Sequence, residues 1–349
     1  MSEPTVPGAE RRTITTADGV EVSYLDAGSG PAVVLAHGFP ELAYSWRHQV
    51  PALVDAGFRV LAPDQRGYGR SGRPDPVEAY DISHLSGDLM ALLDAAEAER
   101  AGVVGHDWGS IVAWNTALLH GSRVAGVVGM SVPFIPRAPA PPIQIMRQVF
   151  AGAFFYMVYF QDRGVADAEL GADPATTMRR LLAGATMGGS DGSDGAGDMT
   201  SFFADDGRGF VERIPEPDAL PDWLSQAELD TYVAEFTRTG YTGGINWYRN
   251  LDRNWELTPQ LAGAKVEVPS LFVGGAADPV LMMTPPGAAE EFLSDHRGTV
   301  LIDGAGHWVQ QEAPGPVNDA LLAFVTAVRD EGRFASPGSG GPGSAGGAG

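Results

Sequence analysis

The sequence predicts an α/β fold: a mostly parallel β-sheet with helices on both faces, interrupted by an inserted helical cap. Short apolar segments alternate with helix-forming segments up to residue 132, and the alternation returns after residue 259. Parallel strands covered on both faces are short apolar runs, joined through helices. We therefore expect one core from 1–132 and 260–334, a helical cap at 133–259, and a disordered tail at 335–349, which is rich in Gly, Ser and Pro.

In the first part of the core, residues 1–10 are expected to be loose. The elements that follow are strands at 21–29 and 32–38, a helix within 45–57, a strand at 58–64, a helix at 82–100, a strand at 101–106, a helix at 110–120 and a strand at 123–132. The helix within 45–57 is expected to have Ser45 as its N-cap and Gly57 just after its end.

The inserted region lacks this rhythm and is rich in proline and aromatic residues. Within it, the Gly-Ser-Asp stretch at 187–199 is expected to be a flexible loop. Beyond it, the core is expected to resume with a strand at 265–278, a helix at 285–295, a strand at 298–303 and a helix at 316–332.

The charge balance is strongly acidic, with 44 Asp and Glu against 23 Lys and Arg and a formal net charge of −21. Such a surface repels nucleic acid and anionic membranes, so neither is expected as a partner. The apolar run at 151–160 is too short to span a bilayer, and residues 1–12 lack the apolar centre of a signal peptide. Cysteine is absent, which fits the reducing cytoplasm, where we expect the protein to act.

The stretch VVGHDWGS (103–110) places an aspartate, Asp107, between two glycines, after an apolar strand and before a helix. This is the pattern of a nucleophile elbow, G-x-S-x-G, with a carboxylate in place of the serine. A carboxylate is already ionised at neutral pH and needs no base before it attacks. It can displace a leaving group at an sp³ carbon and form an ester with itself. The pattern therefore predicts alkyl transfer to Asp107.

Asp278 and His307 each follow a later strand, in the chain order nucleophile, acid, histidine that such enzymes use. An ordinary turn aspartate and a helix-start histidine are the structural alternatives. A histidine oriented by an acid can deprotonate the water that cleaves the ester. Of the seven histidines only His307 meets this order, and His106 is expected to point away from Asp107. No metal-ligand spacing such as H-E-x-x-H is present, so we expect no metal and no cofactor.

The loop HGFPE (37–41) follows a strand at the position that supplies a backbone donor to an oxyanion hole. We expect the N–H groups of Phe39 and Trp108 to bind the negative oxygen that develops during ester cleavage. A hydrogen-bonded surface turn is the alternative interpretation of the loop.

The leaving group is less constrained. A haloalkane would release halide, which is bound by weak N–H donors, whereas an epoxide opens to an alkoxide that needs a proton donor. The inserted region offers four tyrosines that could donate, namely Tyr156, Tyr159, Tyr241 and Tyr248. Core packing with a satisfied hydroxyl is the alternative for each.

Taken together, the motifs resemble those of the soluble epoxide hydrolases with the α/β-hydrolase fold. The residues that carry the resemblance are HGFPE (37–41), DQRGYGRS (64–71), GHDWGS (105–110), YFQ (159–161), NWYRN (246–250), Asp278 and GHW (306–308). The resemblance covers roughly residues 12–330 and implies hydrolysis of an epoxide to a vicinal diol, with Tyr156 and Tyr248 holding the epoxide oxygen.

From this resemblance we expect a small apolar epoxide and water as the substrates, and a monomer or homodimer. The residues expected to line the substrate pocket are His37, Pro40, Phe155, Trp247 and Trp308.

A dehalogenase and a non-catalytic ligand-binding protein are the alternative functions. A haloalkane dehalogenase shares the aspartate nucleophile, but Phe39 stands where a halide-binding Asn or Trp is often found. Fluoroacetate dehalogenases carry an arginine after the nucleophile, where this chain has Trp108. A non-catalytic ligand-binding relative would usually lack the nucleophile or the histidine, and both are present.

Overall fold

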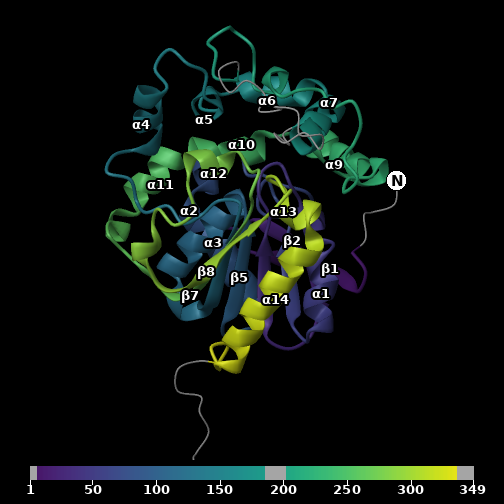
Figure 1. Cartoon of the computed structure of the whole chain (residues 1–349), viewed down its shortest axis with the longest axis vertical. Helices are drawn as coiled ribbons and strands as arrows, with labels where there is room; N and C mark the ends of the chain where they lie inside the picture. The colour runs from purple at the N-terminus through teal and green to yellow at the C-terminus, as the bar shows by residue number, and fades with distance from the viewer. Residues whose placement is uncertain (1–5, 185–201, 336–349) are drawn as a thin grey trace, which may run out of the picture.

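The computed structural model describes residues 6–184 and 202–335 (Figure 1). Its centre is an eight-stranded sheet in the order β1-β2-β4-β3-β5-β6-β7-β8. The strands are β1 (Ala9–Thr15), β2 (Glu21–Gly28), β3 (Ala32–Ala36), β4 (Arg59–Pro63), β5 (Ala101–His106), β6 (Val124–Met130), β7 (Val266–Gly275) and β8 (Leu293–Ile302). All neighbouring pairs from β4 to β8 are parallel, whereas β1–β2 and β2–β4 are antiparallel. The prediction of a mostly parallel sheet is confirmed.

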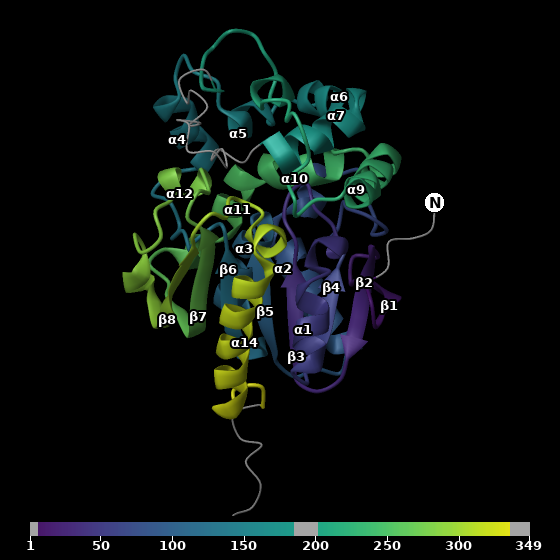
Figure 2. The ribbon, with the colours of Figure 1, turned by 45° about the vertical axis from the view of Figure 1, so that its right-hand side comes forward.

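Two pairs of helices cover the two faces of this sheet (Figures 1 and 2). One pair is α1 (Gln49–Asp55) with α14 (Pro314–Asp330), and the other is α2 (Ile82–Ala95) with α3 (Trp108–Leu119). Strand β3 shows the reason, because all of its residues are apolar and alternate ones point to opposite faces. Val34 packs in the cluster beneath α2 and α3, while Val33 and Leu35 pack in the cluster beneath α1 and α14.

The described residues between β6 and β7 contain helices and connecting segments but no strand. We call this region the cap. Its helices are α4 (Pro142–Val149), α5 (Tyr156–Tyr159), α6 (Val165–Ala172), α7 (Pro174–Arg179), α9 (Gln226–Thr239), α10 (Thr242–Arg249) and α11 (Leu251–Leu257). The cap lies over one end of the sheet, the end at which the parallel strands finish (Figure 2).

Two local predictions are wrong, and one strand was not predicted. The helix expected from Ser45 begins only at Gln49, and the Ser45 hydroxyl instead lies 2.8 Å from the Tyr232 hydroxyl in the cap. The helix expected at 285–295 is a single turn, Glu290–Phe292, because β8 begins directly after it and pairs with β7. Strand β1 was not expected, since part of it falls in the segment taken as loose. It is largely exposed and forms the edge of the sheet, so its sequence lacks a buried face.

The loop expected at 187–199 lies outside the described residues, as does all of the expected tail except Ala335. Within the described ranges, no helix combines the length and the apolar character needed to cross a membrane.

Candidate active site

Asp107 stands at the sharp turn between β5 and α3. Its φ of +53° lies in the left-handed region, which residues with a Cβ rarely adopt. Two glycines allow the chain to pack around this turn. A Cβ on Gly105 would collide with the carbonyl of Gly109, and a Cβ on Gly109 would collide with the carbonyl of Ala36. The glycine spacing seen in the sequence therefore reflects close approach of three backbone segments.

Asp278 and His307 lie beside Asp107, at the ends of β7 and β8. His307 Nδ1 lies 3.0 Å from Asp278 Oδ2, and His307 Nε2 lies 3.6 Å from Asp107 Oδ2. Burial alone would lower the pKa of His307, but the two carboxylates outweigh it and raise the pKa well above its ordinary value. Burial likewise opposes ionisation of Asp278, yet the contact with His307 lowers the pKa of that carboxyl. The two carboxylates on either side of the imidazole therefore favour its protonated form.

The backbone around His307 is held by hydrogen bonds to three side chains, those of the half-buried Glu312 and of the buried Ser131 and His106. The carboxylate of Glu312 accepts hydrogen bonds from the N–H groups on either side of His307, at 2.7 and 2.8 Å. The carbonyl of His307 lies 2.7 Å from both the Ser131 hydroxyl and the Nε2 of His106. These contacts set the direction in which the imidazole leaves the main chain.

A buried imidazole–carboxylate pair lies beneath this loop. His106 Nδ1 lies 2.6 Å from Glu41 Oε2, and both side chains are fully buried. Glu41 also accepts from the N–H of Gly38 and from two glutamine side chains of α13 (Val309–Glu312). Burial raises the pKa of Glu41, but His106 and the Gly38 N–H outweigh it and lower the pKa to about 2. The pair joins three segments of the site: the loop after β3, the elbow, and the segment after β8.

The loop after β3 brings a backbone donor to the nucleophile. The N–H of Phe39 donates a hydrogen bond of 2.8 Å to Asp107 Oδ1. Gly38 lies so close that a Cβ there would collide with the Asp107 side chain. Trp108, whose N–H is the other predicted donor, is the first residue of α3 and is buried.

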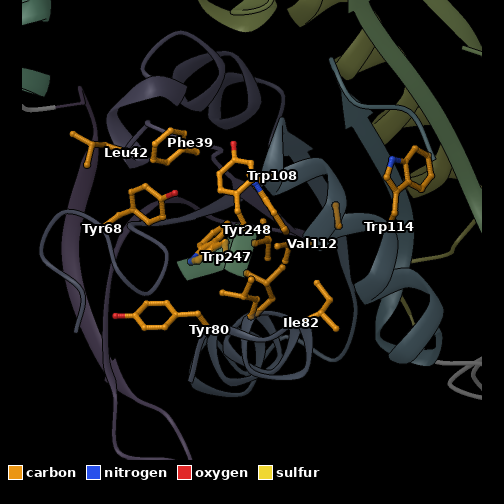
Figure 3. Packing of buried hydrophobic residues seen from close by; sticks show 14 of the residues in the cluster. Phe39, Leu42, Tyr68, Tyr80, Ile82, Trp108, Val112, Trp114, Trp247 and Tyr248 are labelled. Atoms are coloured by element: carbon orange, nitrogen blue, oxygen red, sulfur yellow. The ribbon is translucent and has the colours of Figure 1, made fainter. Parts of the chain in front are cut away.

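Tyr156 and Tyr248 reach the same cavity from the cap. Their ring centroids are 5.8 Å apart. Tyr248 also packs edge-on against Phe39 and Trp108 of the core, at centroid distances of 5.5 and 5.0 Å (Figure 3). Burial and the charge of Asp107 raise the pKa of both phenols well above the ordinary value, so both remain protonated donors at neutral pH.

The cavity that contains these groups has a volume of about 230 Å³ and mainly apolar walls. Its lining residues are Phe39, Pro40, Asp107, Phe155, Tyr156, Leu181, Gly184, Phe202, Phe203, Phe210, Arg213, Ile214, Pro215, Tyr248, Pro279, Val280, Met283, His307 and Trp308. Three of the five residues expected to line the pocket are therefore present: Pro40, Phe155 and Trp308.

The other two expected lining residues, His37 and Trp247, are not part of the cavity wall. His37 Nε2 accepts a hydrogen bond from the Gln65 N–H, behind the loop that carries Phe39. Trp247 packs edge-on behind Trp108 and donates its indole N–H to the carbonyl of Arg66. Trp247 adjoins the lining residue Tyr248 in the chain and His37 lies two positions before the lining residue Phe39, yet neither side chain reaches the cavity wall.

Sequence reasoning missed two groups of residues. Glu41 lies in the HGFPE motif, but nothing in that motif shows that it pairs with His106, which is 65 positions away. The aromatic wall from Phe202 to Phe210 was also missed. Its support, Arg213, has a side chain only 1% exposed, which donates to the carbonyls of Phe202 and Ala204. The one sequence signal for an aromatic wall is the pair of adjacent phenylalanines at 202–203.

An aspartate on an elbow, with an acid and a histidine after later strands of a mostly parallel sheet, defines a hydrolase of the α/β class. In agreement, the family model described as the alpha/beta hydrolase fold matches residues 31–314.

More specific relatives were also found. The chain is 55% identical to epoxide hydrolase A of Mycobacterium tuberculosis over 92% of this chain and 99% of the relative. It is 40% identical to epoxide hydrolase B of the same species, covering 86% and 92%. A crystal structure of epoxide hydrolase A from Mycobacterium thermoresistibile has a TM-score of 0.86 at 55% identity, covering 91% and 98%. The chain therefore belongs to the epoxide hydrolase family of the α/β hydrolase fold.

Proposed function

We propose that this protein hydrolyses small apolar epoxides to vicinal diols through a covalent ester on Asp107. The observation that carries the proposal is the shared cavity: a carboxylate nucleophile, two protonated phenols and an acid-oriented histidine line one mainly apolar space. The names of the relatives support the substrate class. We also propose that the protein acts in the cytoplasm, a reducing compartment with which a chain free of cysteine is compatible.

In the first step, an oxygen of Asp107 attacks one epoxide carbon, and the bond from that carbon to the epoxide oxygen breaks. The oxygen leaves as an alkoxide that stays attached to the substrate. Tyr156 or Tyr248 donates a proton to it, which yields a hydroxyl group. Because no base is required for this attack, His307 has no part in it. The product is a hydroxyalkyl ester of Asp107.

Ester formation removes the negative charge of Asp107. Since that charge helps to raise the pKa of His307, its loss makes the imidazole easier to deprotonate. The proton that His307 loses restores the tyrosine that protonated the alkoxide. Neutral His307 then takes a proton from water, and the hydroxide attacks the carbonyl carbon of the ester. The N–H groups of Phe39 and Trp108 stabilise the tetrahedral oxyanion. Collapse releases the diol, with a proton returned to its oxygen, and restores Asp107 with one oxygen from water.

The variant His307→Gln tests this mechanism. It should open the epoxide once and then stall, because attack needs no base whereas ester cleavage does. Intact-mass spectrometry after addition of styrene oxide should show one substrate mass, and peptide mapping should locate it on Asp107. Wild-type protein in a single turnover in ¹⁸O-water should carry the label into the Asp107 carboxylate.

Direct hydration of the epoxide, with Asp107 as a base, predicts no adduct and a labelled diol in the first turnover. That result would exclude the covalent mechanism. Chloride release from 1-chlorobutane at a rate comparable with epoxide opening would instead favour a dehalogenase.

A further inference from the structure

Gln161 joins the two cap segments that carry the phenols, although it does not line the substrate cavity. Its side-chain Nε2 donates to the carbonyl of Met157 at 2.7 Å and to the carbonyl of Tyr248 at 3.1 Å. Met157 is the neighbour of Tyr156 in α5. A carbonyl can only accept, so the amide must present its nitrogen to both partners. One amide group thus connects the main chain beside Tyr156 to the main chain of Tyr248.

Arg249 makes the reverse connection. Its Nε donates to the carbonyl of Phe160 at 3.0 Å, and its guanidinium pairs with Asp167 at 2.6 Å. Gln161, which follows Phe160, therefore binds the carbonyl of Tyr248. Arg249, which follows Tyr248, binds the carbonyl of Phe160. The two connections cross and restrain sliding of α5 along α10.

The two phenols themselves meet only through ring contacts. Tyr156 and Tyr248 pack against each other and both pack against Phe160. Ring packing tolerates small displacements, whereas hydrogen bonds to fixed carbonyls have narrow distance and angle limits. Donation to a developing alkoxide needs the donor within hydrogen-bond reach. The separation of the two donors therefore depends on the crossed pair of side chains.

We propose that Gln161 is a positioning residue that sets the spacing of the Tyr156 and Tyr248 hydroxyls for epoxide opening. The proposal rests on the proposed function, in which these phenols donate to the epoxide oxygen. Gln161 faces a second, polar cavity, lined also by Arg163, Arg249 and Arg253, and Asp107 is not among the residues that line it. It therefore acts on the reaction only through the placement of the tyrosines.

The test is Gln161→Met, which keeps the length of the side chain but has no donor, compared with Gln144→Met on the exposed face of α4. Single-turnover kinetics with styrene oxide separate ester formation from ester cleavage. Loss of two neutral hydrogen bonds should slow ester formation about tenfold. Ester cleavage, which depends on His307 and Asp278, should keep its wild-type rate. The Gln144 variant should match wild type in both steps.

A merely structural role for Gln161 would change both steps together or lower only the melting temperature, and that outcome would overturn the proposal. Gln161→Glu provides a second variant, because its carboxylate is solvated in the polar cavity but cannot donate to either carbonyl. It should show the same selective loss of ester formation as the Met variant.

A double-mutant cycle then tests whether Gln161 acts through the phenols. In the Tyr156→Phe background, Gln161→Met should cost clearly less than tenfold, because one of the two placed donors is already absent. Full additivity would contradict the proposal. If Tyr156→Phe and Tyr248→Phe themselves left ester formation unchanged, the proposed function would fail instead. If they slowed it while Gln161→Met did not, only the positioning role would fail.

Discussion

The core side of the site is fixed mainly by charges and hydrogen bonds, whereas the cap side is fixed mainly by aromatic packing. In the core, His307 is held through its side chain by Asp278 and through its main chain by Glu312 and His106. In the cap, Tyr248 is surrounded by edge-on rings that include Phe160 and Trp108.

This difference follows from the chemistry of each side. A buried charge must be paired, and its partners then set its position as well as its pKa. A neutral phenol in an apolar pocket has no such requirement, so aromatic rings can surround it, and main-chain contacts such as those of Gln161 refine its position. Substitutions that change a charge should therefore affect the core side of the site most. Substitutions that change side-chain shape or remove one hydrogen-bond donor should affect the cap side most.

The largest effect is expected from the cap, where the hydroxyls can be removed without a change of shape. Tyr156→Phe and Tyr248→Phe should each slow ester formation, and the double variant should be nearly inactive. Removal of one donor at a developing oxyanion typically costs ~10²-fold or more, although two donors that partly replace each other share the loss. Rapid-quench measurement of the Asp107 ester gives the rate directly.

Tyr159→Phe is the matched control, because the Tyr159 hydroxyl donates to Glu169 outside the cavity. It should keep the wild-type rate of ester formation. Wild-type turnover in the double variant would show that the cap only shapes the pocket. The claim that the cap tyrosines donate to the epoxide oxygen would then be wrong.

A second, smaller effect is expected in the core. Glu41→Gln removes the charge that faces His106 but keeps the size of the side chain. The Glu41 carboxylate is a buried charge held by hydrogen bonds. Removal of such a charge from its partners costs roughly 3 kcal/mol of stability, and urea unfolding at pH 7 should show this. Glu267→Gln, on an exposed position of β7, should leave stability unchanged.

The pH dependence of this effect has a defined sign. The pKa of Glu41 is lowered to about 2 from an ordinary 4.5. Its stabilisation is therefore fully present above pH 4.5 and is lost as the pH falls toward 2. The difference between wild type and Glu41→Gln should shrink over that window. A difference that stayed constant from pH 7 to pH 2 would show that the charge of Glu41 is not what holds this side of the site.

The same contrast explains what the sequence could predict. Asp107, Asp278 and His307 each follow a strand, and parallel strands end at one edge, so local patterns were enough to bring them together. The need for glycines around Asp107 also appears in a short stretch of sequence, because the backbone segments of the elbow pack too closely to leave room for a Cβ. The sequence therefore predicted the helices and strands near the elbow correctly.

The sequence of the cap predicts less about the site. No periodic pattern relates Tyr156 to Tyr248, which are 92 positions apart by their numbering, and a resemblance to known proteins was needed to select them from four tyrosines. The directions of neighbouring residues were also hidden, so Trp247 was expected in the pocket although it packs behind Trp108. Helix packing, rather than chain order, determines which of these rings meets the cavity.

The smallest effect is expected in the pKa of His307. Its change shows how the charge of Asp107 influences the histidine before and after the ester forms. In the free protein the charges of Asp278 and Asp107 both raise this pKa. Asp107→Asn, a neutral mimic of the ester, should therefore lower it. Asp278→Asn should lower it further, because Asp278 is the stronger of the two influences and lies closer, at 3.0 Å against 3.6 Å.

NMR titration of the His307 imidazole measures both changes directly. The ordering matters for turnover: with Asp107 neutral, His307 loses its proton more readily while Asp278 still orients it, so the base becomes available only once the ester exists. The wild-type imidazolium stabilises the fold fully below an unfolded-state pKa of about 6.5 and loses this contribution as the pH rises through its higher folded-state pKa. In Asp107→Asn the folded-state pKa is lower, so that loss should be complete at a lower pH than in the wild type. If the pKa of His307 were unchanged in this variant, the charge of Asp107 would not control the histidine, and the two steps of the reaction would need another cause for their order.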